Sequence, residues 1–356
     1  MAHPTGLISS CPFRRCLLLA FAFFGLLSGA ASQSQNPRLE LLLHKGQNAL
    51  AGGDFADGVS AFEEAQQLAP ENLAVNRGLV LSYLHAGRLS DATNAGKRAV
   101  ARWPNDAQLQ HWLGLAYFKE DMNGPALEAL KRSAKLDPSP FGIHFDIALV
   151  LLSQQQYSSA ADELEKAIKL DPSDALAHVL LGRAYQNSNR TLQAIEQFQI
   201  ALHVDPDLAL AHYHLAFAYA SLGRDTEAIA EYQKEIAHSP RNPAVLYQLG
   251  HSLLEIGDLK AASTYLHQAV ELDPQNHDAL YDLGKTFLLA GDAASAVTAL
   301  RHAIELNPAS PSAHYQLSRA LEKLGQNEEA QHERQRFEEL KKTQPASGGM
   351  ATARSQ

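Results

Sequence analysis

Apolar and small side chains recur along the chain in two helical patterns, and both patterns repeat every 34 residues from Leu39 to Gln344. In each unit, positions 4, 7, 8 and 11 fall on one face of a first helix, and positions 20, 24 and 27 fall on one face of a second. Position 7 is leucine in seven units and position 20 is alanine in eight. The pattern therefore predicts an all-α chain built from pairs of amphipathic helices.

Turn-forming residues separate the predicted helices. Glycine or asparagine is frequent at position 15, and these residues tolerate the left-handed conformation that ends a helix. Proline at position 32 disfavours helical geometry in the residue before it and ends the second helix. These prolines are Pro70, Pro104, Pro138, Pro172, Pro206, Pro240, Pro274 and Pro308. The resulting units span residues 39–72, 73–106, 107–140, 141–174, 175–208, 209–242, 243–276, 277–310 and 311–344. One helix pair cannot bury its apolar face alone, so neighbouring units are expected to stack.

The repeated positions resemble those of the tetratricopeptide repeat family, whose signature places Leu-Gly, Tyr, Ala, Phe and Pro at the same offsets. The resemblance covers 306 of 356 residues. It is weakest at Lys45, Gly58, Gly96, Arg334 and Lys342, which depart from the pattern. It implies an α-solenoid, a right-handed superhelix of helix-turn-helix repeats. In this family, the first helices line a concave groove that binds segments of other proteins.

The N-terminal segment has the pattern of a secretory signal peptide. Arg14 and Arg15 precede an uncharged apolar run from Cys16 to Leu27, and small residues follow up to Ala31. We therefore expect residues 1–31 to direct export to the periplasm or the extracellular space, with an uncleaved membrane anchor as the alternative. Residues 32–38 form a short lead, and residues 345–356 are expected to be a disordered tail.

Charge and motif content disfavour several classes of function. The net charge of -9 argues against nucleic acid, which requires basic surfaces. The sequence contains no nucleophile elbow, phosphate-binding loop, dinucleotide fingerprint or zinc-protease motif. His144, His178, His212 and His314 share position 4, one repeat apart, so we interpret them as packing residues and not as ligands of one metal ion. No catalytic residue, cofactor or metal is therefore predicted.

Surface positions remain as candidates for function. Positions 2, 5, 9, 12 and 13 share a face of the first helix away from its packing face. In units 5 to 9 this face carries aromatic and basic residues, beginning with Arg183 in unit 5. Those of units 6 to 9 form a set that we call the tyrosine face: Tyr213, Phe217, Tyr247, His251, Tyr281, Lys285, Tyr315 and Arg319. In units 2 to 4 it carries a set that we call the apolar face: Leu81, Leu115, Phe118, Phe145 and Leu149. Both sets are predicted to contact a partner, because exposed apolar strips mark interaction sites and tyrosine and arginine are frequent in binding hot spots. The alternative is that they only pack against neighbouring first helices.

These observations favour an exported, non-catalytic adaptor that binds an extended peptide or a helix of a partner protein in the groove. The alternative is a structural subunit of a cell-envelope assembly, such as polysaccharide export or secretion machinery, docked through the apolar face. An enzyme or a carbohydrate-binding protein is a third class, for which the sequence offers no motif. Family members that bind chaperone C-termini carry lysine at position 5 and asparagine at position 9 of one unit. No unit here has that pair.

Overall fold

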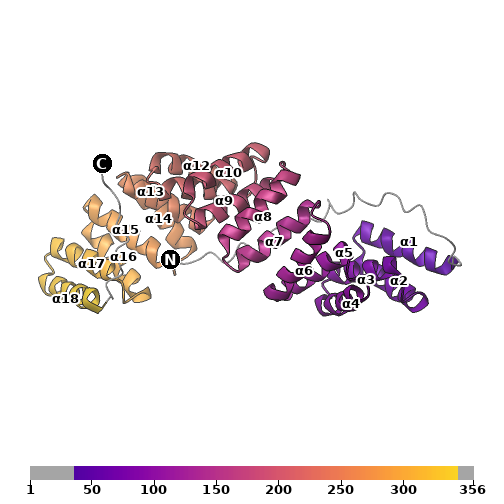
Figure 1. Ribbon diagram of the computed structural model, residues 1–356. Coiled ribbons are helices and arrows are strands. Elements are labelled where there is room, and N and C mark those ends of the chain that lie inside the picture. Colours follow the sequence, from indigo (N-terminus) through magenta and orange to yellow (C-terminus); the bar gives the residue numbers. More distant parts are fainter. Residues whose placement is uncertain (1–35, 344–356) are drawn as a thin grey trace. The chain divides into compact units, whose positions relative to one another are not determined.

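The computed structural model describes residues 36–343, and every regular element in that range is an α-helix. The predicted signal peptide and the predicted tail lie outside the described residues. Within that range the eighteen helices form nine consecutive pairs, one pair for each 34-residue unit (Figure 1). The all-α prediction and the two helices predicted for each unit are therefore confirmed.

The chain divides into two compact parts between Ala177 and His178, inside α9 (Ala175–Asn187). The helices before α9 are α1 (Pro37–Gly52), α2 (Phe55–Leu68), α3 (Leu73–His85), α4 (Leu89–Arg102), α5 (Ala107–Lys119), α6 (Asn123–Leu136), α7 (Phe141–Ser153) and α8 (Tyr157–Leu170). The helices after it are α10 (Thr191–Val204), α11 (Ala211–Ser221), α12 (Asp225–His238), α13 (Pro243–Glu255), α14 (Leu259–Leu272), α15 (His277–Ala290), α16 (Ala293–Leu306), α17 (Pro311–Lys323) and α18 (Asn327–Thr343).

The turn inside each unit has one backbone conformation throughout. Position 15 has a positive φ, between 58° and 90°, in all nine units. Six of these residues are glycine, and the other three are Asp121, Gln155 and Asn189. Because the turn geometry is kept even where a side chain must occupy the left-handed region, the stacking of the units outweighs the local cost of that conformation.

Position 34 provides the N-cap of the next first helix in most units. Asn72, for example, accepts a hydrogen bond from the backbone N–H of Val75 at 3.1 Å, and Asp106 accepts one from Leu109 at 2.9 Å. Such a side chain satisfies one of the four backbone N–H groups that a helix leaves unpaired at its start. Leu208 occupies this position before α11 and cannot act as a cap.

Complementary side-chain sizes close the core of each helix pair. Gly182 at position 8 faces Phe198 at position 24, and a Cβ on this glycine would lie 2.5 Å from Phe198 Cε1. The second unit reverses the sizes, with the buried Val80 at position 8 and Gly96 at position 24. Gly96 makes room for Leu113 of the next unit, because a Cβ on this glycine would lie 3.0 Å from Leu113 Cδ1.

Polar side chains at position 4 attach several of the first helices to the proline turn before them. Asn76 Nδ2 donates to the backbone carbonyl of Pro70 at 2.9 Å. His144 Nε2 lies 3.2 Å from the Pro138 carbonyl, and its Nδ1 lies 2.7 Å from a carboxylate oxygen of Glu163 on the second helix. His144, His178 and His314 are buried packing residues, as interpreted from the sequence, and His212 is half-buried.

Candidate functional site

The first helices of successive units contact one another directly within each part of the chain. The contacts join α1 to α3, α3 to α5 and α5 to α7 in the first part, and α11 to α13, α13 to α15 and α15 to α17 in the second. Each part therefore contains a continuous layer of first helices. The apolar face lies on α3, α5 and α7, and the tyrosine face lies on α11, α13, α15 and α17.

The apolar face is largely taken up by packing inside the protein. Leu81 and Leu115 are half-buried against the core between α2 and α5, and Phe118 and Leu149 are also half-buried. Phe145 is only 4% exposed and joins the core of α7. None of these five side chains is fully exposed.

The tyrosine face begins with an aromatic pair on α11. The rings of Tyr213 and Phe217 are stacked, with centroids 6.4 Å apart. Tyr213 also lies against the buried Tyr232 of α12, at 6.0 Å, and its burial raises the pKa of its hydroxyl. Phe217 is 40% exposed. The pair therefore combines a ring held by the core with a ring that is open to solvent.

Glu235 holds the start of this helix in place of the missing cap. Most first helices begin at position 1 of their unit, whereas α11 begins at Ala211, which is position 3. Leu210, the residue before it, has a φ of 64°. The carboxylate of Glu235, which is 2% exposed, accepts a hydrogen bond from the backbone N–H of Tyr213 at 3.3 Å. A negative charge at a helix N-terminus is favourable, so a side chain from α12 fixes the position of Tyr213.

Carboxylates contact the two basic side chains in the middle of the tyrosine face. His251 Nδ1 lies 2.8 Å from the carboxylate of Asp282, which is buried, and this hydrogen bond raises the pKa of the imidazole. Lys285 Nζ lies 3.3 Å from the carboxylate of Glu255. Burial and the Asp282 carboxylate also raise the pKa of Tyr247, whose ring centroid is 6.1 Å from that of His251. Both ion pairs join neighbouring first helices.

The C-terminal end of the tyrosine face is basic. The guanidinium of Arg319 lies 5.9 Å from the ring centroid of Tyr315, which is 39% exposed, and it donates to the Gln316 side chain at 3.3 Å. Lys323 Nζ donates to the backbone carbonyl of Leu288 at 3.1 Å. Neither cation has a carboxylate partner within residues 36–343.

The structure adds two residues that the sequence interpretation did not include. Lys323 occupies position 13 of the predicted face, so the repeat alignment could have identified it. Glu235 occupies position 27, which is alanine in the neighbouring units at Ala201 and Ala269. A carboxylate at a repeat position that is otherwise small and buried could have marked Glu235 as a functional residue.

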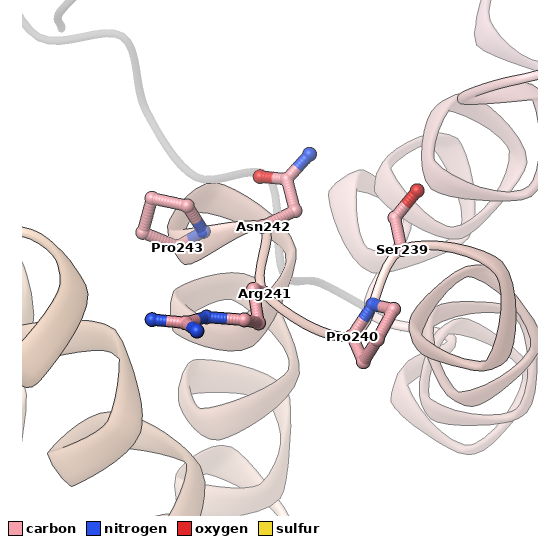
Figure 2. Close-up of a pocket in the computed structure, with 5 residues that line it drawn as sticks. All are labelled: Ser239, Pro240, Arg241, Asn242 and Pro243. Atoms are coloured by element: carbon pink, nitrogen blue, oxygen red, sulfur yellow. The ribbon is translucent and has the colours of Figure 1, made fainter.

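Other features of the described chain do not form a ligand site. The hollow in Figure 2 is lined by Ser239, Pro240, Arg241, Asn242 and Pro243, consecutive residues of the turn between α12 and α13. One turn supplies all of its groups, so no side chains converge on it from separate elements. Within residues 36–343, no three histidine, cysteine or acidic side chains gather as metal ligands would. No helix in this range has the length and apolar content needed to cross a bilayer.

Comparison with known proteins identifies the repeat. A family model described as "Tetratricopeptide repeat" matches residues 43–107, 179–243 and 247–311. A model described as "TPR repeat" matches residues 148–189, and a further tetratricopeptide repeat model matches residues 287–336. None of the curated proteins compared with the chain matches its sequence.

Solved structures share the fold at low sequence identity. A chain of the APC/C hetero-tetramer Cut9-Hcn1 is 20% identical with a TM-score of 0.51, over 87% of this chain and 59% of that one. PilF of Pseudomonas aeruginosa is 19% identical with a TM-score of 0.51, over 58% of this chain and 94% of that one. YrrB, described as a TPR protein with an unusual peptide-binding site, is 24% identical with a TM-score of 0.47, over 52% of this chain and 96% of that one. The family matches together cover more than half of the sequence, and this chain therefore belongs to the tetratricopeptide repeat family.

Proposed function

We propose that this protein is a non-catalytic adaptor that binds an extended segment of a partner protein along the tyrosine face. Tetratricopeptide repeat proteins are, as a class, scaffolds for interactions between proteins. The observation that carries the proposal is the recurrence of a tyrosine at position 5 of four successive first helices that contact one another, at Tyr213, Tyr247, Tyr281 and Tyr315. By resemblance to the family, these first helices are expected to line a concave groove.

The tyrosines offer both apolar surface and hydrogen-bonding groups. Within residues 36–343, no hydrogen bond to another protein group occupies the hydroxyl of Tyr247, Tyr281 or Tyr315. A hydroxyl can bond to the backbone of a bound peptide while the ring covers an apolar side chain. An extended peptide presents backbone groups and side chains in regular alternation, so a regular row of tyrosines suits it.

Substitution of two central tyrosines tests this proposal. Tyr247→Ala with Tyr281→Ala should reduce partner capture from the native cell envelope, read by mass spectrometry, because both rings and both hydroxyls are removed. The matched control is Tyr265→Ala on α14, a second helix, which should leave capture unchanged. Circular dichroism must show equal helicity in all variants. Undiminished capture by the double variant would remove the tyrosine face from the binding site.

We further propose that the protein is exported, on the basis of the sequence of residues 1–31. Arg14 and Arg15 before the apolar run are the supporting feature. The test is the mass and cell fraction of the chain recovered from an exporting host. A chain that begins near Ser32 in the periplasm or medium supports export with cleavage, and a full-length chain in the membrane supports the anchor. Recovery of the full-length chain from the cytoplasm would contradict both.

The structural role in an envelope assembly receives no specific support from the geometry of the apolar face. Its side chains are buried or half-buried within the protein, whereas Phe217 and Tyr315 of the tyrosine face are exposed. A permanent complex that is abolished by Leu115→Glu, with helicity retained, would favour that role over the adaptor.

A further inference from the structure

The tyrosine face changes character from repeat to repeat. Position 9 is Phe217 on α11, His251 on α13, Lys285 on α15 and Arg319 on α17. At the five face positions of unit 6, the Tyr213 hydroxyl is the one ionisable group, because the other four residues are Leu210, Phe217, Ala220 and Ser221. From α11 to α17 the face therefore changes from aromatic to cationic, and Arg183 occupies position 9 of the preceding first helix, α9.

The cations along this face differ in whether their charge is already compensated. His251 and Lys285 each contact a carboxylate of a neighbouring first helix. Arg319 and Lys323 contact only an amide oxygen, an aromatic ring and a backbone carbonyl among the described residues. The carboxylate closest to them in sequence, that of Glu322, is paired with Arg334 at 2.6 Å. The last first helix thus presents two cations whose charge is not balanced by an adjacent carboxylate.

The arrangement of these two cations suits an anionic group on a partner. They are four residues apart, so their side chains leave the same side of α17 one turn from each other. The Arg319 guanidinium can bind a carboxylate through two parallel hydrogen bonds, and Lys323 adds a second charge. The ring of Tyr315 beneath Arg319 limits the directions that the guanidinium can take.

We propose that the partner segment is extended and polarised, with a bulky apolar side chain against Tyr213 and Phe217 and carboxylates at Arg319 and Lys323. This inference rests on the proposed function and specifies the chemistry of its ligand. The two contact points lie three helix steps apart, from α11 to α17. Packed helices are separated by about 8–10 Å, so the span is roughly 24–30 Å. At about 3.3 Å per residue, an extended chain covers this span with about seven to nine residues.

Synthetic peptides binding to the full-length chain test the inference by fluorescence anisotropy. Each peptide carries a tryptophan at one end and a pair of glutamates at the other, joined by a serine-rich spacer. The series includes both orders of these two groups. The spacers range from about two to about twelve residues, which brackets the expected span. Affinity should be highest at about seven to nine spacer residues in at least one direction. Replacing the glutamates with lysines should weaken binding about tenfold or more, the equivalent of losing one good ionic contact.

Charge reversal on the protein provides the decisive comparison. Arg319→Glu with Lys323→Glu should weaken the glutamate peptide at least about tenfold and strengthen the lysine peptide. The matched control reverses two exposed lysines of α18, Lys341→Glu with Lys342→Glu, and should change neither affinity. Phe217→Ala should weaken all tryptophan peptides, whatever the sign of their charged end.

Three results would overturn the inference: no binding of any peptide, affinity that is independent of spacer length and charge sign, or equal effects of the two charge reversals. The proposed function would remain if Tyr247→Ala with Tyr281→Ala still abolished capture of the native partner. The ligand chemistry and the use of the tyrosine face can therefore fail separately.

Discussion

Acidification should destabilise this protein through His214, a histidine held in its neutral form. Its ring stacks on Phe198 of α10 at 5.7 Å and meets the edge of Tyr213 at 5.4 Å. Burial, and after it the positive charge of Arg183, lower the pKa of the imidazole from 6.5 to about 3. The protonated imidazolium is therefore far less stable in the folded chain than in the unfolded chain, where water surrounds it.

The difference in pKa sets both the sign and the size of the effect. Above pH 6.5 the histidine is neutral in both states, so it adds no pH dependence. Between pH 6.5 and about 3 only the unfolded chain binds the proton, so the free energy of unfolding falls as the pH falls. From pH 7.5 to pH 5 the loss is about 2 kcal/mol. This figure depends mainly on the unfolded pKa, because the folded form stays neutral at pH 5 for any folded pKa below about 4.

Urea unfolding at the two pH values tests this prediction in the wild type, His214→Phe and His214→Gln. Glutamine already occupies the same repeat position at Gln248 and Gln316, so it is compatible with this helix face. Both variants lack the titrating group, and each should lose about 2 kcal/mol less than the wild type on acidification, whatever its own stability at pH 7.5. An equal loss in all three proteins, or an imidazole that titrates near its ordinary pKa by NMR, would refute the reasoning.

Three further predictions concern the packing and the helix start. Tyr232→Phe should raise the free energy of unfolding by about 1 kcal/mol, because the buried hydroxyl has no hydrogen-bond partner among the described residues; a lower urea midpoint would show that it has one. Gly182→Val should lower the free energy of unfolding by about 1–3 kcal/mol, because the added methyl groups crowd Phe198. Calorimetry should find a smaller loss when the same substitution is made in a Phe198→Ala variant. Glu235→Ala should lower the free energy of unfolding by about 1 kcal/mol and speed amide hydrogen exchange at the start of α11. Adding Leu208→Asn to this variant should restore protection from exchange, because asparagine is an ordinary N-cap residue. Exchange that stays fast in the double variant would contradict the role of Glu235 as a substitute cap.

Much of the fold could be predicted from the sequence because the repeated pattern reports local structure. Leucine, small residues and alanine recur with helical spacing, and proline and glycine mark where the helices end. The structure places most helix boundaries where those signals indicate, but α1 begins at Pro37, inside the predicted lead, and α11 begins two residues late. There the absence of a capping residue at Leu208 was visible in the sequence, but its replacement by Glu235 was not, because the two residues are far apart along the chain.

The candidate site was predictable in position and not in character. Alignment of the repeats places Tyr247 and Phe145 at the same position 5 of their units. Tyr247 is half-buried on the tyrosine face, whereas Phe145 is 4% exposed. In the same way, Lys285 and Arg319 share position 9, yet only Lys285 has a carboxylate partner in the described structure.

The architecture of this protein can be inferred from its sequence: the helix pairs, their turns and the face of each first helix that points away from its packing surface. These features follow from periodicities of a few residues, which act locally and are the same in every unit. In contrast, the folded arrangement of the helices sets which side chains on that face are exposed, which charges are balanced and what holds the start of α11. Exposure and pairing depend on the side chains that a neighbouring helix brings into contact, and the pattern within one repeat contains no information about them.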